Sequence, residues 1–112
     1  MGMDLTGIAA QVRAHVEDAL AEGAQVILDR SDELVPKESG DLAASGSVNK
    51  GASGTNTVAI KYSSVYARYI HENMQFKHPT GGSAKFLELA MNEKGSDAIS
   101  KTGDEIRKVL ET

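Results

Sequence analysis

The stretch from Tyr62 to Met91, YSSVYARYIHENMQFKHPTGGSAKFLELAM, is the most informative part of this 112-residue chain. It holds all three tyrosines, both phenylalanines and two of the three histidines. Tyr66, Tyr69 and Ile70 recur at i, i+3 and i+4, a spacing that predicts a short aromatic helix with one apolar face. So many aromatic side chains in one segment indicate packing against a core or a partner, not a catalytic centre.

Residues 73–83 contain a His-Pro pair and a Gly-Gly pair, which predict a polar loop after the aromatic helix. A helix is expected from about Ala84, with an apolar side made of Phe86, Leu87, Ala90 and Met91. Gly95 is expected to end or bend this helix. A last helix from about Asp97 should be marginal by itself because it contains Gly103.

Two strands are predicted upstream of the aromatic segment. Residues 57–63 alternate cleanly, with one side made of Val58, Ile60 and Tyr62. Residues 45–50 form a weaker candidate strand around Val48, and the polar loop 51–56 would join the two as a hairpin. The apolar side of this sheet is expected to pack on the N-terminal helix.

Residues 4–34 have the period of one long amphipathic helix. Its apolar stripe comprises Leu5, Ile8, Val12, Val16, Ala19, Gly23, Ile27 and Leu34. Another side collects Asp4, Asp18, Glu22, Asp29 and Glu33, which we interpret as a solvated face. Asp4 is a candidate N-cap, and Pro36 should stop the helix near Leu34.

The length of this helix bears on assembly. About 30 residues at 1.5 Å each span roughly 45 Å, whereas a compact chain of this size has a diameter of about 34 Å. Either the helix breaks, with Gly23 as the candidate site, or a second copy or partner covers the part that projects. We favour the partner.

The composition fits a single domain over residues 1–112, with 40% apolar and 25% charged residues. The chain has no cysteine, which excludes disulfides and thiolate metal sites, and no apolar run that predicts a membrane span. The expected fold is α+β: the long N-terminal amphipathic helix packed on a small antiparallel sheet, with the short aromatic helix and C-terminal helices.

His71, Glu72 and His78 form the best metal-site candidate, but adjacent residues on a helix diverge by about 100°. Local hydrogen bonding is the favoured interpretation. The segment 81–85, GGSAK, lacks the spacing of a phosphate-binding loop, and its Ser83 is better explained as a helix N-cap. We therefore predict no catalytic residue, no metal and no cofactor.

Nucleic-acid binding is a weaker hypothesis. The net charge is −4, whereas general nucleic-acid binders are usually basic. The aromatic segment could stack single-stranded bases, but its only accompanying cations are Lys61, Arg68, Lys77 and Lys85. Core or interface packing is the favoured interpretation of the aromatic side chains.

Several short patterns occur in a fixed order along the chain. They are Val35-Pro36-x-x-Ser39-Gly40-x-Leu42, Ser45-x-Ser47-Val48, Tyr66-Ala67-x-Tyr69-Ile70-x-Glu72 and Lys85-Phe86-Leu87-x-x-Ala90-Met91. Together with the long N-terminal helix, this order resembles the small head–tail joining proteins of long-tailed bacteriophages, also called tail-completion or minor capsid proteins. The resemblance covers about residues 5–110; the segment 71–79 departs from the short glycine-containing turn that more typical members have there.

The resemblance implies a non-enzymatic virion subunit of the phage neck that forms a homo-oligomeric ring, commonly a hexamer. Such a ring terminates the tail tube, contacts the tail tube protein and the head connector, and lets DNA pass as cargo, without any membrane. The protein would occur in the host cytoplasm during assembly. Candidate interface residues or loop anchors are Tyr66, Tyr69, Phe76, His78 and Phe86, and candidates on the projecting helix are Leu5, Ile8, Val12 and Val16.

Three alternatives stay open at this stage. The chain could be a peripheral minor capsid or head-closure protein of the same virion. It could be a small nucleic-acid-binding regulatory module, which would require a localised basic face. It could also be a metal-dependent hydrolase that uses His71, Glu72 and His78.

Overall fold

The computed structural model of the chain describes residues 5–35, 42, 44–51, 57–63, 65–70, 75–80 and 85–111. Two long helices and one four-stranded antiparallel sheet make up this part of the chain. The expected α+β class with a small antiparallel sheet is thereby confirmed. The candidate caps Asp4 and Ser83, together with Pro36, lie outside the described residues.

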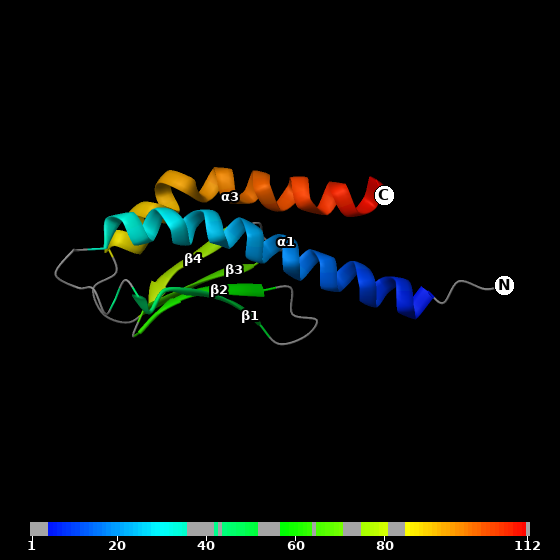
Figure 1. Cartoon of the computed structure of the whole chain (residues 1–112), viewed down its shortest axis with the longest axis horizontal. Coiled ribbons are helices and arrows are strands. Elements are labelled where there is room, and N and C mark those ends of the chain that lie inside the picture. Colours follow the sequence, from blue (N-terminus) through cyan, green and yellow to red (C-terminus); the bar gives the residue numbers. More distant parts are fainter. Residues whose placement is uncertain are drawn as a thin grey trace.

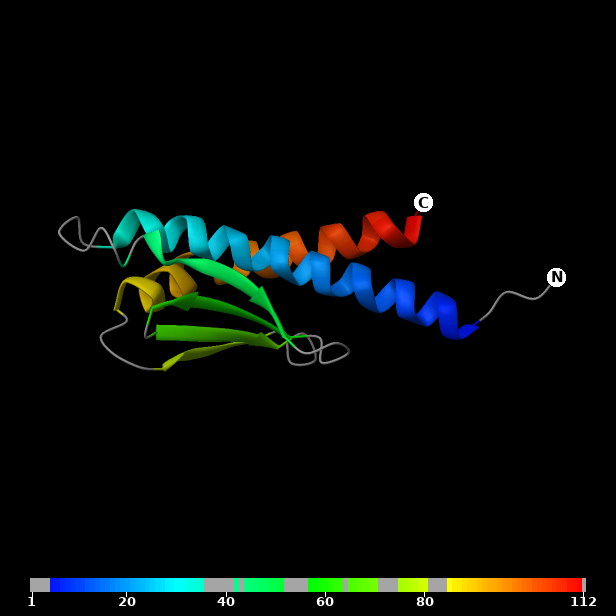
Figure 2. The same ribbon diagram turned by 60° about the horizontal axis from the view of Figure 1, so that its bottom comes forward.

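The two helices lie on one face of the sheet. Helix α1 runs from Leu5 to Leu34, and helix α3 runs from Lys85 to Glu111. Figure 1 shows them side by side above the strands, and Figure 2 shows the same two layers from another direction. Helix α1 contacts β1 and β2, whereas α3 contacts α1 and β4, so the opposite sheet face carries no described element.

The sheet is a simple meander in the order β1-β2-β3-β4. Its strands are β1 (Ser47–Lys50), β2 (Thr57–Tyr62), β3 (Val65–Ile70) and β4 (Gln75–Thr80). The two strands expected from the sequence are present, and they pair antiparallel with Val48 opposite Ile60. The pairing of β3 with β4 shifts register between Tyr66 and Arg68.

The hydrophobic core lies between the helical layer and the inner sheet face. The sheet contributes Val58, Ile60, Tyr62, Val65 and Ala67, all at most 3% exposed. Helix α1 contributes Leu20, Ala24, Ile27 and Leu28, and α3 contributes Leu87, Ala90 and Ala98. The predicted alternation of β2 is confirmed, because Val58, Ile60 and Tyr62 are buried while Lys61 is exposed.

The predicted short aromatic helix is wrong. Tyr66, Tyr69 and Ile70 belong to strand β3, which pairs along its whole length with β2. Six residues are too few for the i, i+3, i+4 pattern to be distinguished from a strand, and the segment is rich in aromatic and β-branched residues that favour strands. Burial of Val65 and Ala67 on the inner sheet face follows the two-residue period.

The predicted loop over residues 73–83 is also wrong in its central part, which forms strand β4. Pro79 argued against a strand, because proline cannot donate a backbone hydrogen bond. However, β4 is the last strand of the sheet, and proline is tolerated at an edge where one side of the strand needs no partner.

The expected pair of C-terminal helices is a single helix. Helix α3 continues through both Gly95 and Gly103, although each lowers helix propensity by about 1 kcal/mol relative to alanine. Buried contacts of Ala98 and Thr102 against α1 stabilise the helix between the two glycines. Tertiary packing therefore overrides the local preference to break.

The molecule is elongated. Its radius of gyration is 15.4 Å and it measures 60 × 23 × 22 Å, whereas a compact chain of this length has a radius of gyration of about 13 Å. The excess comes from both helices, which extend past the sheet; the N-terminal part of α1 extends furthest and diverges from α3 in both views (Figures 1 and 2). The helix does not break at Gly23.

Candidate functional site

The crossing of α1 and α3 fixes the direction in which the N-terminal part of α1 projects. Gly23 is buried, and a Cβ atom at this position would collide with Thr102 Oγ1 and lie 2.6 Å from the Ala98 carbonyl oxygen. Thr102 is fully buried and its hydroxyl donates to that same carbonyl at 3.0 Å. Gly23 therefore permits a close backbone approach instead of introducing a bend.

Tyr62 fixes the other end of α1 to the sheet. Its hydroxyl hydrogen-bonds Ser31 Oγ at 2.9 Å and Asp32 Oδ1 at 2.6 Å, and its ring meets Phe86 edge-on at 5.0 Å between centroids. Burial, and secondarily the hydrogen bond to Asp32, raise the pKa of Tyr62 well above its ordinary value. The phenol is thus a neutral structural group that joins β2, α1 and α3.

Ser45 and Gly46 hold the entry to β1 against the end of β2. The Ser45 hydroxyl donates to the Leu42 carbonyl oxygen at 2.6 Å and accepts from the Ser63 backbone N–H at 3.1 Å. A Cβ on Gly46 would lie 2.8 Å from the Tyr62 ring and 3.0 Å from Asp32 Oδ1. The Leu42 and Ser45 positions of the sequence patterns therefore have a structural role.

The projecting part of α1 is the first candidate assembly surface. Among its described side chains, Gln11, Ala14, His15 and Asp18 are exposed. Val16 is half-buried at the border of the core. Leu5, Ile8 and Val12 continue the stripe of Val16 along the backbone that extends beyond the sheet in Figure 1. This surface is where a neighbouring molecule would have most access.

Strands β3 and β4 carry the other predicted interface residues. The register places Tyr69 opposite Phe76 and Tyr66 opposite Thr80, so the sheet brings together residues that the sequence separates by a presumed loop. His78 lies on β4. Phe86 is 8% exposed and contacts Tyr62, which makes it a core residue of this subunit.

A shallow groove runs between α1 and α3 on the outer side of the helical layer. Arg30 lies in it and donates to Glu93 Oε2 at 2.6 Å and to Glu33 Oε2 at 2.7 Å. Val26, Asp29 and Lys94 complete the lining. The hydrogen bond from Arg30 lowers the pKa of Glu93, and the partly exposed Arg30–Glu93 ion pair links the two helices.

Charge is segregated between the two layers, a feature that is not evident from the sequence alone. The four strands contain four Lys or Arg residues and no Asp or Glu, whereas α1 contains six acidic and two basic residues. Lys61 and Arg68 are exposed on adjacent strands, on the sheet face opposite the helices. The signal in the sequence is the two-residue period of the two strands, which places both cations on one face when β2 and β3 pair.

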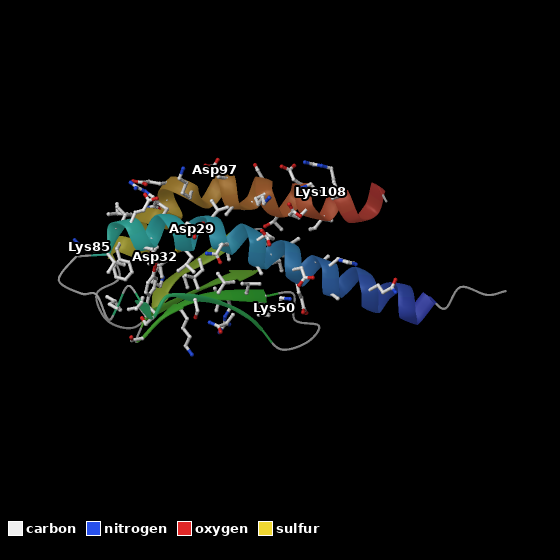
Figure 3. The ribbon with its side chains drawn as sticks, viewed as in Figure 1. Asp29, Asp32, Lys50, Lys85, Asp97 and Lys108 are labelled. Atoms are coloured by element: carbon white, nitrogen blue, oxygen red, sulfur yellow. The ribbon has the colours of Figure 1, made fainter. Side chains whose placement is uncertain are left out.

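The helical layer carries the opposite charge. On α1 an acidic stripe consists of Asp18, Glu22, Asp29, Asp32 and Glu33, all exposed. Figure 3 labels Asp29 and Asp32 on α1 and Asp97 on α3, while Lys50 lies below α1 at the end of the sheet. Lys50 forms an ion pair with Asp18, which raises the pKa of Lys50. The predicted solvated face is confirmed for Asp18, Glu22, Asp29 and Glu33.

The metal site and the phosphate-binding loop considered from the sequence fall mostly outside the residues that the structure describes. His71 and Glu72 lie outside the described residues, as do residues 81–84 of the GGSAK segment. Within the described part of the chain, no three His, Cys, Asp or Glu side chains converge as metal ligands. No helix among the described residues is both long enough and apolar enough to cross a membrane.

Comparisons with known proteins leave the chain without an assigned relative. No family model matches it. Neither a curated protein nor a solved structure matches it either.

Proposed function

We propose that this chain is a structural subunit of the neck of a long-tailed bacteriophage, where it assembles into a ring that completes the tail and joins it to the head. It is non-enzymatic and acts in the virion after assembly in the host cytoplasm. Its partners are further copies of itself, the tail tube protein and the head connector. The order of sequence patterns and the resemblance that they carry support this proposal.

One structural observation carries most of the argument: α1 extends beyond the domain that it stabilises (Figures 1 and 2). The apolar period of the buried half, with Ala19 and Ile27, continues into this extension through Leu5, Ile8, Val12 and Val16. A helix with an apolar stripe needs a surface to cover it. A neighbouring subunit provides that surface in every copy of a closed ring.

The contact that we propose is heterologous, because the projecting helix and the surface that receives it are different parts of the chain. Such head-to-tail contacts close into rings when the rotation between copies permits. The candidate receiving surface is the edge of the sheet formed by β3 and β4, where the register places Tyr66 on the open face and the pair Tyr69 and Phe76 on the face that carries the helices. Tyr66 and His78 belong to the same two strands.

The experiment is native mass spectrometry of the purified protein, alone and mixed with the tail tube protein. The variant Leu5→Gln/Ile8→Gln/Val12→Gln should keep the thermal midpoint of the wild type within about 2 °C, because these positions belong to the part of α1 that extends beyond the sheet (Figure 1). Its ring occupancy should fall at least tenfold. Ala14→Gln is the matched control, since Ala14 is exposed and lies on the other side of α1.

Two results would count against the proposal. A wild-type protein that remains monomeric at high concentration, both alone and with the tail tube protein, would remove the ring. Unchanged assembly of the triple variant would remove the projecting helix from the contact.

A second candidate function has one observation in its favour. A nucleic-acid-binding module requires a localised basic face, and Lys61 and Arg68 provide part of one on the open side of the sheet. A salt-dependent mobility shift of a DNA oligonucleotide at micromolar protein would support that function. The net charge of −4 and the acidic helical layer argue against it.

A further inference from the structure

The two layers of this molecule present surfaces of opposite charge in different directions. The open face of the sheet exposes Lys61 and Arg68, and the strands contain no acidic residue that could neutralise them. The helical layer, on the other side of the sheet, exposes the acidic stripe Asp18, Glu22, Asp29, Asp32 and Glu33. A single chain therefore carries both halves of an electrostatic contact and cannot bring them together within itself.

The two cations on the sheet are available for such a contact. Neither Lys61 nor Arg68 forms an ion pair with another side chain that the structure describes, unlike Lys50, which Asp18 holds. Register pairing sets Lys61 opposite Tyr66 and Ala59 opposite Arg68, so the two side chains sit diagonally on neighbouring strands. Diagonal neighbours on a sheet face are about 7–8 Å apart at their backbones.

Two members of the acidic stripe are placed where the cations of a neighbouring copy can reach them. Glu22 and Asp29 are seven residues apart on α1, which places them on the same side and about 10 Å apart along the helix axis. Glu33 is held by Arg30, and Asp32 accepts from Tyr62, so Glu22 and Asp29 are the members best able to meet a new cation. Asp29 accepts a hydrogen bond only from the exposed Gln25 among the described side chains.

We infer that the open, basic face of the sheet of one subunit docks on the acidic stripe of α1 of the next copy of the same chain. This inference rests on the proposed ring and specifies its contact. Each subunit gives its sheet face to one neighbour and its acidic stripe to the other, so the contact repeats head to tail in one direction around the ring. Opposite charges at the two surfaces guide the encounter and fix the register, while the projecting part of α1 supplies apolar burial.

A second copy fits the sheet face better than a nucleic acid does. Only two exposed cations are described on this face, whereas the acidic stripe that lies elsewhere on the same molecule has five members. A polyanion approaching the sheet would also experience the net negative charge of the whole subunit, which is −4. A copy of the chain instead orients so that only its complementary surface faces the cations.

The test is a charge swap between the two surfaces. The sheet variant is Lys61→Glu/Arg68→Glu, and the helix variant is Glu22→Lys/Asp29→Lys; all four positions are exposed. Each variant alone presents like charges at both surfaces and should assemble at least tenfold more weakly than the wild type, as measured by native mass spectrometry and light scattering at low salt. An equimolar mixture of the two should restore assembly, with alternating subunits and even copy numbers.

The control variant is Arg107→Glu/Lys108→Glu, which changes the net charge as much as the sheet variant does but at exposed positions of α3. It should assemble like the wild type. Circular dichroism and thermal melting check that every variant is folded, and added salt should weaken wild-type assembly because it screens exposed charges.

The possible failures are distinguishable. If the wild type forms rings and the sheet variant forms them equally well, or if the mixture fails to recover, the charge contact is overturned while the neck function stands. If the wild type forms no oligomer with itself or with the tail tube protein, the proposed function falls and this contact falls with it. If the sheet variant loses binding of a DNA oligonucleotide but assembles normally, the sheet face belongs to nucleic acid instead.

Discussion

The two halves of α1 have the same apolar period, but the second half packs against α3 and the sheet while the first half projects beyond them. In the second half, Ala19, Leu20, Ala24 and Ile27 are at most 2% exposed, because α3 and the sheet enclose them. In the first half, Val16 is only half-buried at the border of the core, and the helix backbone extends past both the sheet and α3 (Figure 1). One continuous helix therefore packs against the sheet and α3 at one end and projects beyond them at the other, where we propose the assembly contact.

This difference separates stability from assembly along a single element. Substitutions in the second half should change the free energy of unfolding, because they disturb a packed core. Substitutions in the first half should change the population of oligomers instead. The following predictions test that division, in order of decreasing effect on the isolated subunit.

Gly23→Ala should produce the largest loss. The added methyl group meets Thr102 Oγ1 and the Ala98 carbonyl oxygen, which is backbone and cannot rotate away. The helices must separate, and overpacking of this kind costs about 3 kcal/mol of unfolding free energy. Chemical denaturation followed by circular dichroism measures it.

Gly95→Ala and Gly103→Ala are the matched controls, because nothing lies within 4 Å of a Cβ at either position. Each should raise stability by up to about 1 kcal/mol through better helix propensity. A Gly23→Ala variant as stable as these two would mean that the helices do not cross closely at Gly23.

Tyr62→Phe should produce the next largest loss, about 1–3 kcal/mol, because it leaves the buried Ser31 hydroxyl without its partner. The ring and its contact with Phe86 are kept, so the fold should persist. Denaturation at pH 7 measures the difference, and a loss well below 1 kcal/mol would contradict the role of this hydrogen bond.

The same tyrosine gives the protein a stability limit at high pH. The folded state raises the pKa of Tyr62 above the ordinary value of 10.0, so its phenol stays neutral while the unfolded phenol ionises. The contribution of Tyr62 to the free energy of unfolding is fully present below pH 10 and decreases as the pH rises above that value. Thermal melting between pH 9 and 11, compared with Tyr62→Phe, isolates the effect: the two proteins should converge as pH rises, and parallel curves would contradict it.

Glu93→Gln should have the smallest effect on the subunit. It weakens the link between Arg30 of α1 and α3, but both side chains are partly exposed and screened by solvent. The Arg30 hydrogen bonds lower the pKa of Glu93, so the contribution is present above the ordinary value of 4.5 and is lost as pH falls below it. Melting temperatures of wild type and variant should differ slightly at pH 7 and coincide at pH 3 or in high salt.

Local patterns predicted the elements whose signal is long or regular. The long period of α1 and the strict alternation of Val58, Ile60 and Tyr62 each leave one interpretation, and the structure has a helix and a strand there. Six residues around Tyr66 and Tyr69 fit both a helix and a strand, and only pairing with β2 decides between them. Pro79 in β4 was misleading because its position at the sheet edge is a tertiary property.

The candidate surfaces also differ in whether the sequence alone could reveal them. The apolar stripe through Val16 and the exposed acids Glu22 and Asp29 were evident from the helical period. The basic face was not, because Lys61 and Arg68 come together only when β2 and β3 pair. The aromatic character of Phe86 makes it an interface candidate, and its contact with Tyr62 is a tertiary property that the sequence does not reveal.

The sequence by itself determined that the chain forms a long amphipathic helix, an antiparallel hairpin and an α+β fold, because these follow from the periods at which apolar residues recur. Only the tertiary structure decided that Gly23 is a crossing point and that α3 is continuous. It alone also decided which half of α1 is covered and which charges share a face. The physical reason is that burial, close backbone approach and strand pairing depend on residues distant in the chain, which no local pattern encodes.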